Sequence, residues 1–534
     1  MAAAVPLSSA AVSTREPIKA YSPAPGPYRA AVVVGLPAVA AVLYALLHLN
    51  WYLGTPLGRV PVLDERENID LANAIFGGTL PHEPFYRAPG YALLLAGIRQ
   101  AGVSAVGLFP AALLLGTLMH GLNAAFVATL GRRWFGSVAA IIAGLLFALD
   151  PVMVHYATQA LDSTFSLTLF LAGLVFLSSA LAFPGEARHW AGVGIFWAAA
   201  VLVRPNYLLV WIVAPVMASV QHLRGSLRMR IVAASLSGVI LFMAASMWQK
   251  SVTGFPGVLP WQGPYNLWAA NRPGANGRYY SQHVSLPPAL ARSNPARAES
   301  IILYAQETNN GPTDIASMNE HWRKRFLDEV TNHPLEWAKL MARKAYALFN
   351  NWEQYNNKTY AFHKALSPWL WWNPICWGLL FILAVAGATR LASEAPGTAW
   401  AFALIFAACV ASIILFFVSA RFRLPLVALC AVLAGGALSS PLFWKGWSSE
   451  GKFMLSSAVL LAGFICFSTL GGVADNATFV QDHALLARAA YTVGDDALAL
   501  SEARAALQMQ PQHPDALATE KAAQTELAGK ADSK

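Results

Sequence analysis

Residues 30–49 read AAVVVGLPAVAAVLYALLHL and contain no charged side chain. A second apolar run, FSLTLFLAGLVFLSSALAF, occupies residues 165–183. A helix needs about 20 apolar residues to cross the hydrocarbon core of a bilayer, so each run is long enough for one span. The whole 534-residue chain is 56% hydrophobic and only 12% charged, whereas a typical soluble domain is about 25% charged. This pattern predicts an all-α membrane protein that crosses the bilayer many times.

The same test applied along the chain predicts about eleven transmembrane helices. Two of them are short for a full crossing, although neighbouring residues such as 151–154 extend one of them. The predicted spans are Ala30–Leu49, Val106–Leu130, Val138–Leu149, Phe165–Phe183, Trp190–Val203, Tyr207–Val220, Ile231–Trp248, Trp369–Ala388, Ala399–Val418, Leu424–Leu438 and Phe453–Leu470.

The basic residues between the spans orient the chain. Loops on the cytoplasmic side of a membrane are enriched in Lys and Arg, and every second loop here carries at least one. This places the N-terminus inside and, with an odd number of spans, the C-terminus outside. The net charge of +9 is spread over these loops rather than gathered in one stripe, which argues against a nucleic-acid partner. The inner loops carry Arg132, Arg133, Arg188, Arg224, Arg228, Arg230, Arg390, Lys445 and Lys452.

Five regions follow from this topology. Residues 1–29 are rich in Ala, Ser and Pro and are expected to be a disordered cytoplasmic segment. Residues 30–248 are expected to form a transmembrane module whose first outer loop covers 51–105. Residues 249–368 are expected to form a small outer domain, and residues 369–472 the C-terminal transmembrane helices. Within the outer domain, 319–349 is expected to be helical with a break near Pro334.

The polar tail, residues 476–534, is the fifth region. In GDDALALSEARAALQMQP, four residues have the spacing of one tetratricopeptide repeat, namely Gly494, Ala499, Ala506 and Pro511. A single repeat buries its own apolar face poorly. The tail is therefore expected to be helical and to pack against the outer domain or a partner.

The first outer loop contains an amphipathic stretch, Asp64–Phe76. Ile69, Ala72 and Phe76 share one helical face, and Glu67 lies away from it. Such a helix is expected to rest on the membrane surface.

Charged residues at the outer ends of the spans are the candidate functional groups. Burying charge near a bilayer is costly, so such residues are functional hypotheses by default. Carboxylates supply a general base or hold a metal, and arginines bind phosphate through two parallel hydrogen bonds. A lipid-linked sugar phosphate fits both groups, because a carboxylate can deprotonate an acceptor hydroxyl while arginines stabilise the departing lipid phosphate. The candidates are the acids Asp64, Glu65 and Asp162 and the arginines Arg87, Arg204, Arg421 and Arg423.

Structural explanations remain open beside this one. Asp64 and Glu65 favour a helix N-terminus, Asp162 can cap a helix, and the arginines can reach lipid headgroups at span ends. Two other functions also remain open, a transporter of lipid-linked sugars and a membrane-anchored assembly protein that works through the repeat tail.

Three stretches of the sequence are LDERENIDLANAIFGG at 63–78, EPFYRAPGYALLLAG at 83–97 and RFRLPLVALCAVLAG at 421–435. They resemble the bacterial glycosyltransferases of the GT-C fold, and family 39 in particular, which includes protein O-mannosyltransferases and aminoarabinose transferases. The resemblance covers roughly residues 30–440. It implies a multi-pass protein of the bacterial inner membrane, with a cytoplasmic N-terminus and a periplasmic C-terminus.

The resemblance also implies residue roles. Asp64 matches the presumed base, with Glu65 beside it, Asp162 matches an acidic residue at the fourth span, and Arg423 lies in the RFRLP motif. Arg87 matches a basic residue that contacts the lipid phosphate. The implied partners are a polyprenyl-phosphate-linked sugar, a glycan, lipid or protein acceptor, and membrane lipids.

The chain departs from the family pattern beside Arg87. Some relatives place a metal-binding acid immediately before this basic residue, where the present chain has Tyr86, with Glu83 nearby. The family's P-x-x-Y pattern is also shortened, to Pro89-Gly90-Tyr91. A divalent cation, Mg or Mn, therefore has only Asp64 and Glu83 as candidate ligands.

Overall fold

The computed structural model describes residues 27–219, 226–284, 286, 294–309 and 314–532. In these residues the regular structure is entirely helical. The first helix, α1, begins at Pro27, and residues 1–26, most of the N-terminal segment expected to be disordered, lie outside the described residues, as does Arg224 of the inner loops.

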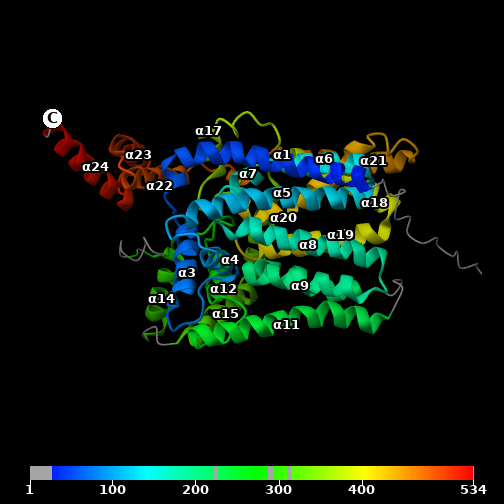
Figure 1. Ribbon diagram of the computed structural model, residues 1–534, viewed down its shortest axis with the longest axis horizontal. Helices are drawn as coiled ribbons and strands as arrows, with labels where there is room; N and C mark the ends of the chain where they lie inside the picture. Colours follow the sequence, from blue (N-terminus) through cyan, green and yellow to red (C-terminus); the bar gives the residue numbers. More distant parts are fainter. Residues whose placement is uncertain (1–26, 220–225, 285, 287–293, 310–313, 533–534) are drawn as a thin grey trace, which may run out of the picture.

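Eight described helices are long and apolar enough to cross a membrane, judged by length and composition. They run side by side, and Figure 1 shows their long axes close to one common direction. The eight are α1 (Pro27–Gly54), α5 (Leu108–Phe135), α8 (Asp162–Ala182), α11 (Leu227–Thr253), α18 (Trp377–Glu394), α19 (Pro396–Ile414), α20 (Ala420–Ser439) and α21 (Ser449–Phe467).

The remaining three predicted spans also fall on apolar helices, but these are shorter or bent. The third is α6 (Ser137–Ala148) followed by α7 (Pro151–Ala157), which meet at 60°. The bend has a local cause, because Pro151 has no backbone N–H and the Asp150 side chain accepts hydrogen bonds from the backbone N–H groups of Val152 and Met153, which starts a new helix. The fifth and sixth are α9 (Ala187–Val203) and the short 3-10 turn η1 (Pro205–Tyr207) with α10 (Leu208–Ala218).

Many helix ends differ from the predicted span boundaries by a few residues, and two of these differences concern where a span begins beside the functional residues or their loops. The eighth span was expected from Trp369, but α18 begins at Trp377, because Asn373 turns the chain through bonds to the Leu149 carbonyl and the Ile375 N–H. The tenth was expected from Leu424, but α20 already begins at Ala420. Arg421 and Arg423 therefore lie in the first turn of a helix.

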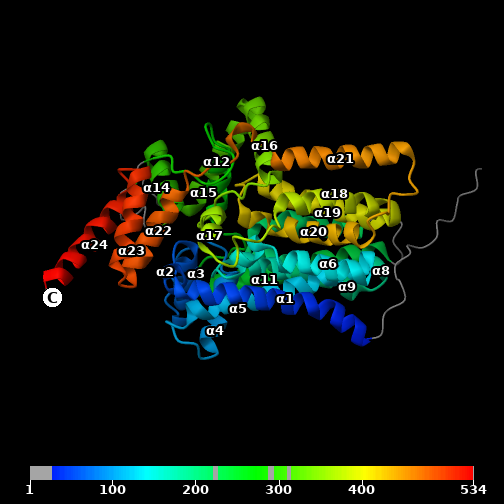
Figure 2. The same ribbon diagram turned by 90° about the horizontal axis from the view of Figure 1, so that it is seen from above.

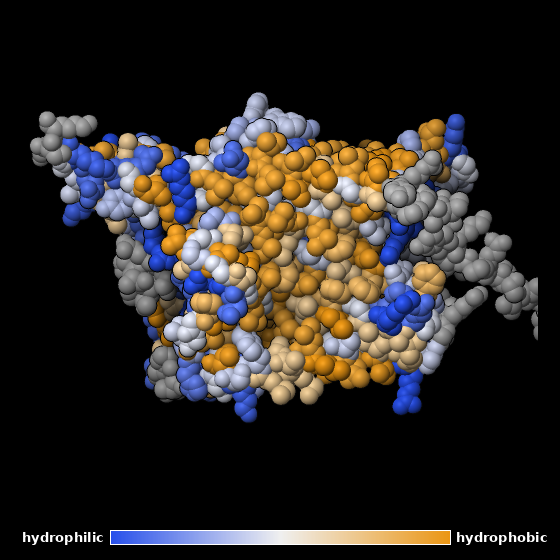
Figure 3. Space-filling model, viewed as in Figure 1, coloured by the Kyte–Doolittle hydropathy of each residue, from blue (hydrophilic) through white to orange (hydrophobic). Residues whose placement is uncertain are grey.

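The centre of the bundle is α20, most of whose residues are buried. It packs against α18, α5 and α6. At Gly387 of α18 a Cβ atom would lie 1.9 Å from the Leu433 carbonyl oxygen, so a glycine is required for this approach. Outer helices such as α11 and α21 expose apolar side chains instead. Figure 3 shows the result as a broad apolar face across the bundle, with hydrophilic residues toward both of its ends.

Short helices gather at one end of the bundle. In Figure 1, α3 runs across the ends of the long helices, near α12, α14 and α15. The expected break at Pro334 is confirmed, since α15 ends at Asn332 and α16 begins at Pro334. These elements are α2 (Pro56–Arg59), α3 (Asp64–Gly77), α4 (Gly90–Gln100), α12 (Gln262–Asn271), α14 (Pro295–Thr308), α15 (Ile315–Asn332), α16 (Pro334–Phe349) and α17 (Tyr360–Leu366).

The tail follows a short turn, η2 (Leu470–Gly472), and forms three helices, α22 (Phe479–Thr492), α23 (Asp496–Met509) and α24 (Pro514–Asp532). The turn between α22 and α23 includes Gly494 at φ +82°, a conformation that favours glycine. Helix α22 packs against α2, and in Figure 2 α24 points away from the bundle. The expected helical tail is present, and its assignment as a tetratricopeptide repeat stays a prediction.

Candidate functional site

A cavity of about 1730 Å³ opens at the end of the bundle where the short helices gather. Its wall is made by α3, the loop before α4, the ends of α9 and α19, the start of α20, helices α12, α14 and α15, and part of the tail. Five of the seven predicted site residues line it, and Glu67, which was not predicted, lines it with them. The predicted five are Asp64, Arg87, Asp162, Arg204 and Arg421.

Asp64 is the first residue of α3 and follows an unusual backbone turn. Leu63 has φ 49° and ψ −127°, which is unfavourable for a residue with a Cβ atom and persists only where the surroundings enforce it. The turn directs the Asp64 carboxylate into the bundle, where 8% of the residue is exposed.

Two arginines hold the Asp64 carboxylate. Arg87 forms an ion pair with one carboxylate oxygen, and Arg421 Nη1 lies 2.9 Å from the other. Burial alone would raise the pKa of Asp64, but the two guanidinium groups outweigh burial and keep the pKa below its ordinary range. Asp64 is therefore ionised at neutral pH. Close packing also places Arg87, because at Gly90 a Cβ atom would lie 2.7 Å from the Leu202 carbonyl oxygen at the end of α9.

Glu67 shares Arg87 with Asp64. Its carboxylate forms an ion pair with Arg87 Nε and accepts a hydrogen bond of 2.7 Å from Asn294. Burial raises the pKa of Glu67, Arg87 opposes this rise, and the charge of Asp64 adds to it. The pKa values of two carboxylates three residues apart are thus shifted in opposite directions. The spacing of three residues, which puts both on one helix face, is the signal that could have identified Glu67.

Arg204, Asp162 and Arg421 form the part of the wall nearest the bundle. Arg204 Nη2 lies 3.7 Å and Arg421 Nη1 lies 4.0 Å from Asp162 Oδ1. Both guanidinium groups lie over the Phe422 ring, at 4.6 Å and 5.6 Å. Arg204 Nη2 and Arg421 Nε are buried without a hydrogen-bond partner among the residues that the structure describes. Unused donors of this kind fit an anion.

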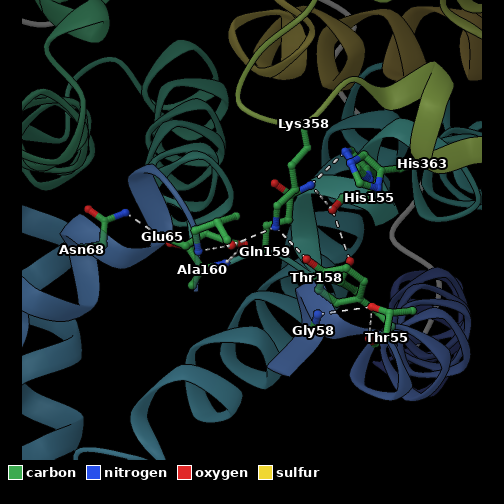
Figure 4. Close-up of polar contacts among 12 residues, drawn as sticks. Thr55, Gly58, Glu65, Asn68, His155, Thr158, Gln159, Ala160, Lys358 and His363 are labelled. Carbon is green, nitrogen blue, oxygen red and sulfur yellow. Dashed lines mark hydrogen bonds and ion pairs between the residues drawn. The ribbon is translucent and has the colours of Figure 1, made fainter. Parts of the chain in front are cut away.

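Glu65 lies outside the cavity wall. Its carboxylate is 2.8 Å from Lys358 Nζ, which also donates to the Tyr52 hydroxyl at 2.6 Å, and both charged side chains are 1% exposed. Burial alone would lower the pKa of Lys358, but Glu65 reverses the shift and the pKa is raised. Figure 4 shows Glu65 beside Ala160, whose N–H points to it, and the Lys358 side chain reaching down from its loop. This pair joins α3 to the segment before α17.

Arg423 also lies outside the cavity wall. Its guanidinium is 1% exposed, pairs with Glu353 at 3.3 Å and donates to the carbonyl oxygens of Asn350 and Trp352. Residues two apart on a helix do not face the same side, so Arg421 points to the cavity and Arg423 points to the chain between α16 and α17. The tertiary structure separates the two arginines of the RFRLP motif.

The carboxylates named as candidate metal ligands do not fit a divalent cation in this arrangement. Both oxygens of Asp64 contact arginines, and Glu83 holds Arg297 through both of its oxygens, at 2.7 Å and 3.0 Å. Among the described parts of the chain, His, Cys, Asp and Glu form no group of three or more with the geometry of a metal site. In this cavity Asp64, Glu67, Glu83 and Asp162 are each paired with an arginine.

One family model matches the chain, over residues 88–248, and it describes dolichyl-phosphate-mannose-protein mannosyltransferase. The match includes Asp162 and Arg204 and begins one residue after Arg87. No curated protein matches the chain.

The solved structures that the chain is similar to include those of two proteins. The oligosaccharyltransferase of Archaeoglobus fulgidus, tethered with an acceptor peptide, is 14% identical with a TM-score of 0.44, and the similarity covers 86% of this chain but only 57% of that one. The same enzyme with an inhibitory peptide and dolichol-phosphate is 15% identical, with a TM-score of 0.44 and 86% and 58% coverage. ArnT from Cupriavidus metallidurans, bound to undecaprenyl phosphate, is 15% identical with a TM-score of 0.30 and 80% and 82% coverage.

Proposed function

We propose that the chain is a membrane glycosyltransferase that moves a sugar from a polyprenyl phosphate to an acceptor hydroxyl. The observation that carries the proposal is the convergence of Arg87, Arg204 and Arg421 on a cavity that also holds Asp64. The family match over residues 88–248 supports the same reaction class. The acceptor is a hydroxyl of a glycan, a lipid or a protein.

The donor phosphate would bind between Arg204 and Arg421. These residues have guanidinium nitrogens without a hydrogen-bond partner among the described residues, and an arginine presents a planar set of donors that matches phosphate oxygens. The wall beside them is apolar, with Leu208, Leu415 and Phe422, which suits the first isoprene units of a lipid. This end of the bundle would be the outer face of a bacterial inner membrane, because the basic loops lie at the opposite ends of the spans.

Asp64 would act as the general base. In the absence of substrate, its two arginines make it a weak base, because a strongly lowered pKa disfavours proton uptake. A phosphate would compete for Arg421, and each contact that Asp64 loses raises its pKa toward the working range. The acceptor oxygen would then attack the anomeric carbon from the side opposite the phosphate while its proton passes to Asp64. The bond between the anomeric carbon and the phosphate oxygen breaks, the lipid phosphate leaves with the electron pair, and the configuration inverts.

Asp64→Asn tests this assignment. The amide keeps the shape of the side chain but cannot accept the proton, so transfer should fall by about a thousandfold, within the range for loss of a general base. The assay uses the purified full chain in detergent, a panel of polyprenyl-phosphate sugars, and mass spectrometry of the products from membrane glycolipid, glycan and protein fractions. Asp70→Asn on the exposed face of α3 is the matched control and should transfer at the wild-type rate. Full transfer by Asp64→Asn would refute Asp64 as the base.

A further inference from the structure

The polar tail contains a fully buried acid. Asp482 of α22 is 1% exposed, and its Oδ1 accepts a hydrogen bond of 2.9 Å from the Thr359 N–H. The same oxygen lies 3.2 Å from His363 Nε2 of α17. Thr478, just before α22, adds a bond of 3.1 Å between its hydroxyl and that of Thr359. The tail thus binds the backbone and side chains of the segment that leads into α17.

That segment is the one that reaches the cavity. Asn357 lines the cavity, as Asp64 does, and its Nδ2 is buried without a hydrogen-bond partner among the described residues. The next residue, Lys358, holds Glu65. The residue after that, Thr359, is held by Asp482. Three consecutive residues therefore reach the cavity, Glu65 and the tail in turn.

The backbone of this segment is irregular. Asn357 has φ 56°, one of three positive-φ residues other than glycine in the described chain. Asparagine adopts this left-handed conformation more readily than other residues with a Cβ atom. His363 adds a second link, because its ring stacks on His155 at 5.5 Å, and Figure 4 shows this pair above the turn that carries Gln159 and Ala160.

The attachment of α22 is also apolar. Leu485, Leu486 and Ala489 belong to the same buried cluster as Tyr52 and Leu57 of the first outer loop. The cavity wall itself includes residues of the tail, among them Thr478, Gln481 and Arg488. A free-standing repeat attached by a linker would show neither feature.

We propose that α22 is a structural part of the functional site and that Asp482 is a positioning residue, which holds the segment that places Asn357 in the cavity wall and Lys358 against Glu65. The catalytic consequence rests on the proposed function, whereas the positioning itself does not. If the tail were instead an independent peptide-binding module, weakening the contacts between the tail and the bundle would leave the segment 356–363 unchanged.

Hydrogen exchange of the full chain tests the positioning. Asp482→Asn exchanges one carboxylate oxygen for an amide nitrogen and removes the charge, so amides of residues 356–363 should exchange about ten times faster, as expected for loss of a charge-assisted bond. Asp495→Asn is the matched control, because Asp495 is an exposed cap at the start of α23 and asparagine caps equally well. Unchanged exchange at 356–363 in Asp482→Asn would overturn the proposal. Should that variant fail to fold, Thr478→Val removes only the hydroxyl contact and should move the same amides in the same direction.

The kinetic measurement tests the consequence for the site. Asp482→Asn should lower kcat for sugar transfer about tenfold or more, because small displacements of reacting groups are costly, while the KM for the polyprenyl-phosphate sugar changes less than twofold. A wild-type kcat alongside faster exchange would refute the link between tail and site. If the wild-type chain transfers no sugar from any donor, the proposed function fails, and the exchange measurement still decides whether Asp482 orders the segment.

Discussion

Asp64 and Glu65 are neighbours in sequence, yet they belong to two different regions of the molecule. Asp64 lies in the wall of a large cavity between two arginines. Glu65 lies behind that wall in a sealed pair with Lys358. Each has a cationic partner, but only the partners of Asp64 have access to a ligand. A charged side chain near the end of a span therefore acquires a binding role only where a cavity reaches it.

The largest expected difference between the two regions is a loss of stability in Glu65→Gln. Removing one partner of a buried ion pair leaves the other charge unpaired, which costs about 3 kcal/mol or more. The variant should therefore lose stability, measured by thermal unfolding of the purified protein, whereas Asp64→Asn should mainly lose activity. Asp70→Asn breaks an exposed pair with Arg66 and should leave the unfolding temperature unchanged. A Glu65→Gln protein as stable as wild type would contradict the conclusion that Glu65 and Lys358 form a buried ion pair.

Replacing both members of the ion pair by apolar side chains should recover much of the stability that Glu65→Gln loses. The double variant Glu65→Leu with Lys358→Met replaces the pair by side chains of similar size, and such replacements are often neutral.

A smaller effect should separate the two arginines of the RFRLP motif. Arg421→Lys keeps the charge but loses the planar fork, so binding of polyprenyl phosphate should weaken about tenfold. Arg423→Lys is the matched control, because Arg423 contacts Glu353 and backbone carbonyls away from the cavity. It should bind the lipid like wild type and melt at a lower temperature. Lipid binding is measured by titration of the lipid. Equal losses in both variants would contradict the assignment of Arg421, and not Arg423, to lipid binding.

The smallest effect should appear in the pH profile of Glu67→Gln. Burial and the charge of Asp64 raise the pKa of Glu67 against the pull of Arg87, while the pKa of Asp64 is lowered. As pH falls from neutral, Glu67 therefore takes up a proton first, above its ordinary pKa of 4.5. The wild-type rate of sugar transfer should therefore fall at acidic pH as Glu67 takes up this proton. In Glu67→Gln the fall should begin at a lower pH.

The effect on stability has a definite sign. A carboxyl group whose folded pKa is raised stabilises the fold most when it is protonated, and this contribution is lost as pH rises through the folded pKa. Glu67→Gln should therefore be at least as stable as wild type at pH 7. Glu83→Gln, which removes another cavity carboxylate, should keep the wild-type pH profile, and an identical shift in both variants would argue against Glu67.

Much of the fold could be predicted from the sequence, because span length and the charge of the loops are local properties. The eight long helices, the break at Pro334 and the amphipathic helix from Asp64 follow from such local patterns. The bend at Pro151 also has a local signal, an Asp-Pro pair that starts a new helix, but it was not predicted. The early start of α20 could not be predicted from its own residues, because the Ala420 N–H donates to the carbonyl oxygen of the distant Gln354.

The candidate site was predictable only in part. Asp64, Arg87, Asp162, Arg204 and Arg421 were found through their common position at span ends. Glu67 was missed because it lies outside the apolar face of its helix. Lys358 and Asp482 were missed because their partners, Glu65 and Thr359, lie 293 and 123 positions away in sequence. Contacts at such separations leave no local pattern.

The sequence by itself determined that this protein is helical, apolar enough to span a membrane, and charged at the ends of its spans, since these properties follow from the solvation of each segment alone. Only the tertiary structure decided which charges meet. Successive residues on a helix point about 100° apart, so Asp64 and Glu65, or Arg421 and Arg423, cannot share one environment. Whether each meets a cavity, a buried cation or the tail depends on which distant segment packs against that side of the helix.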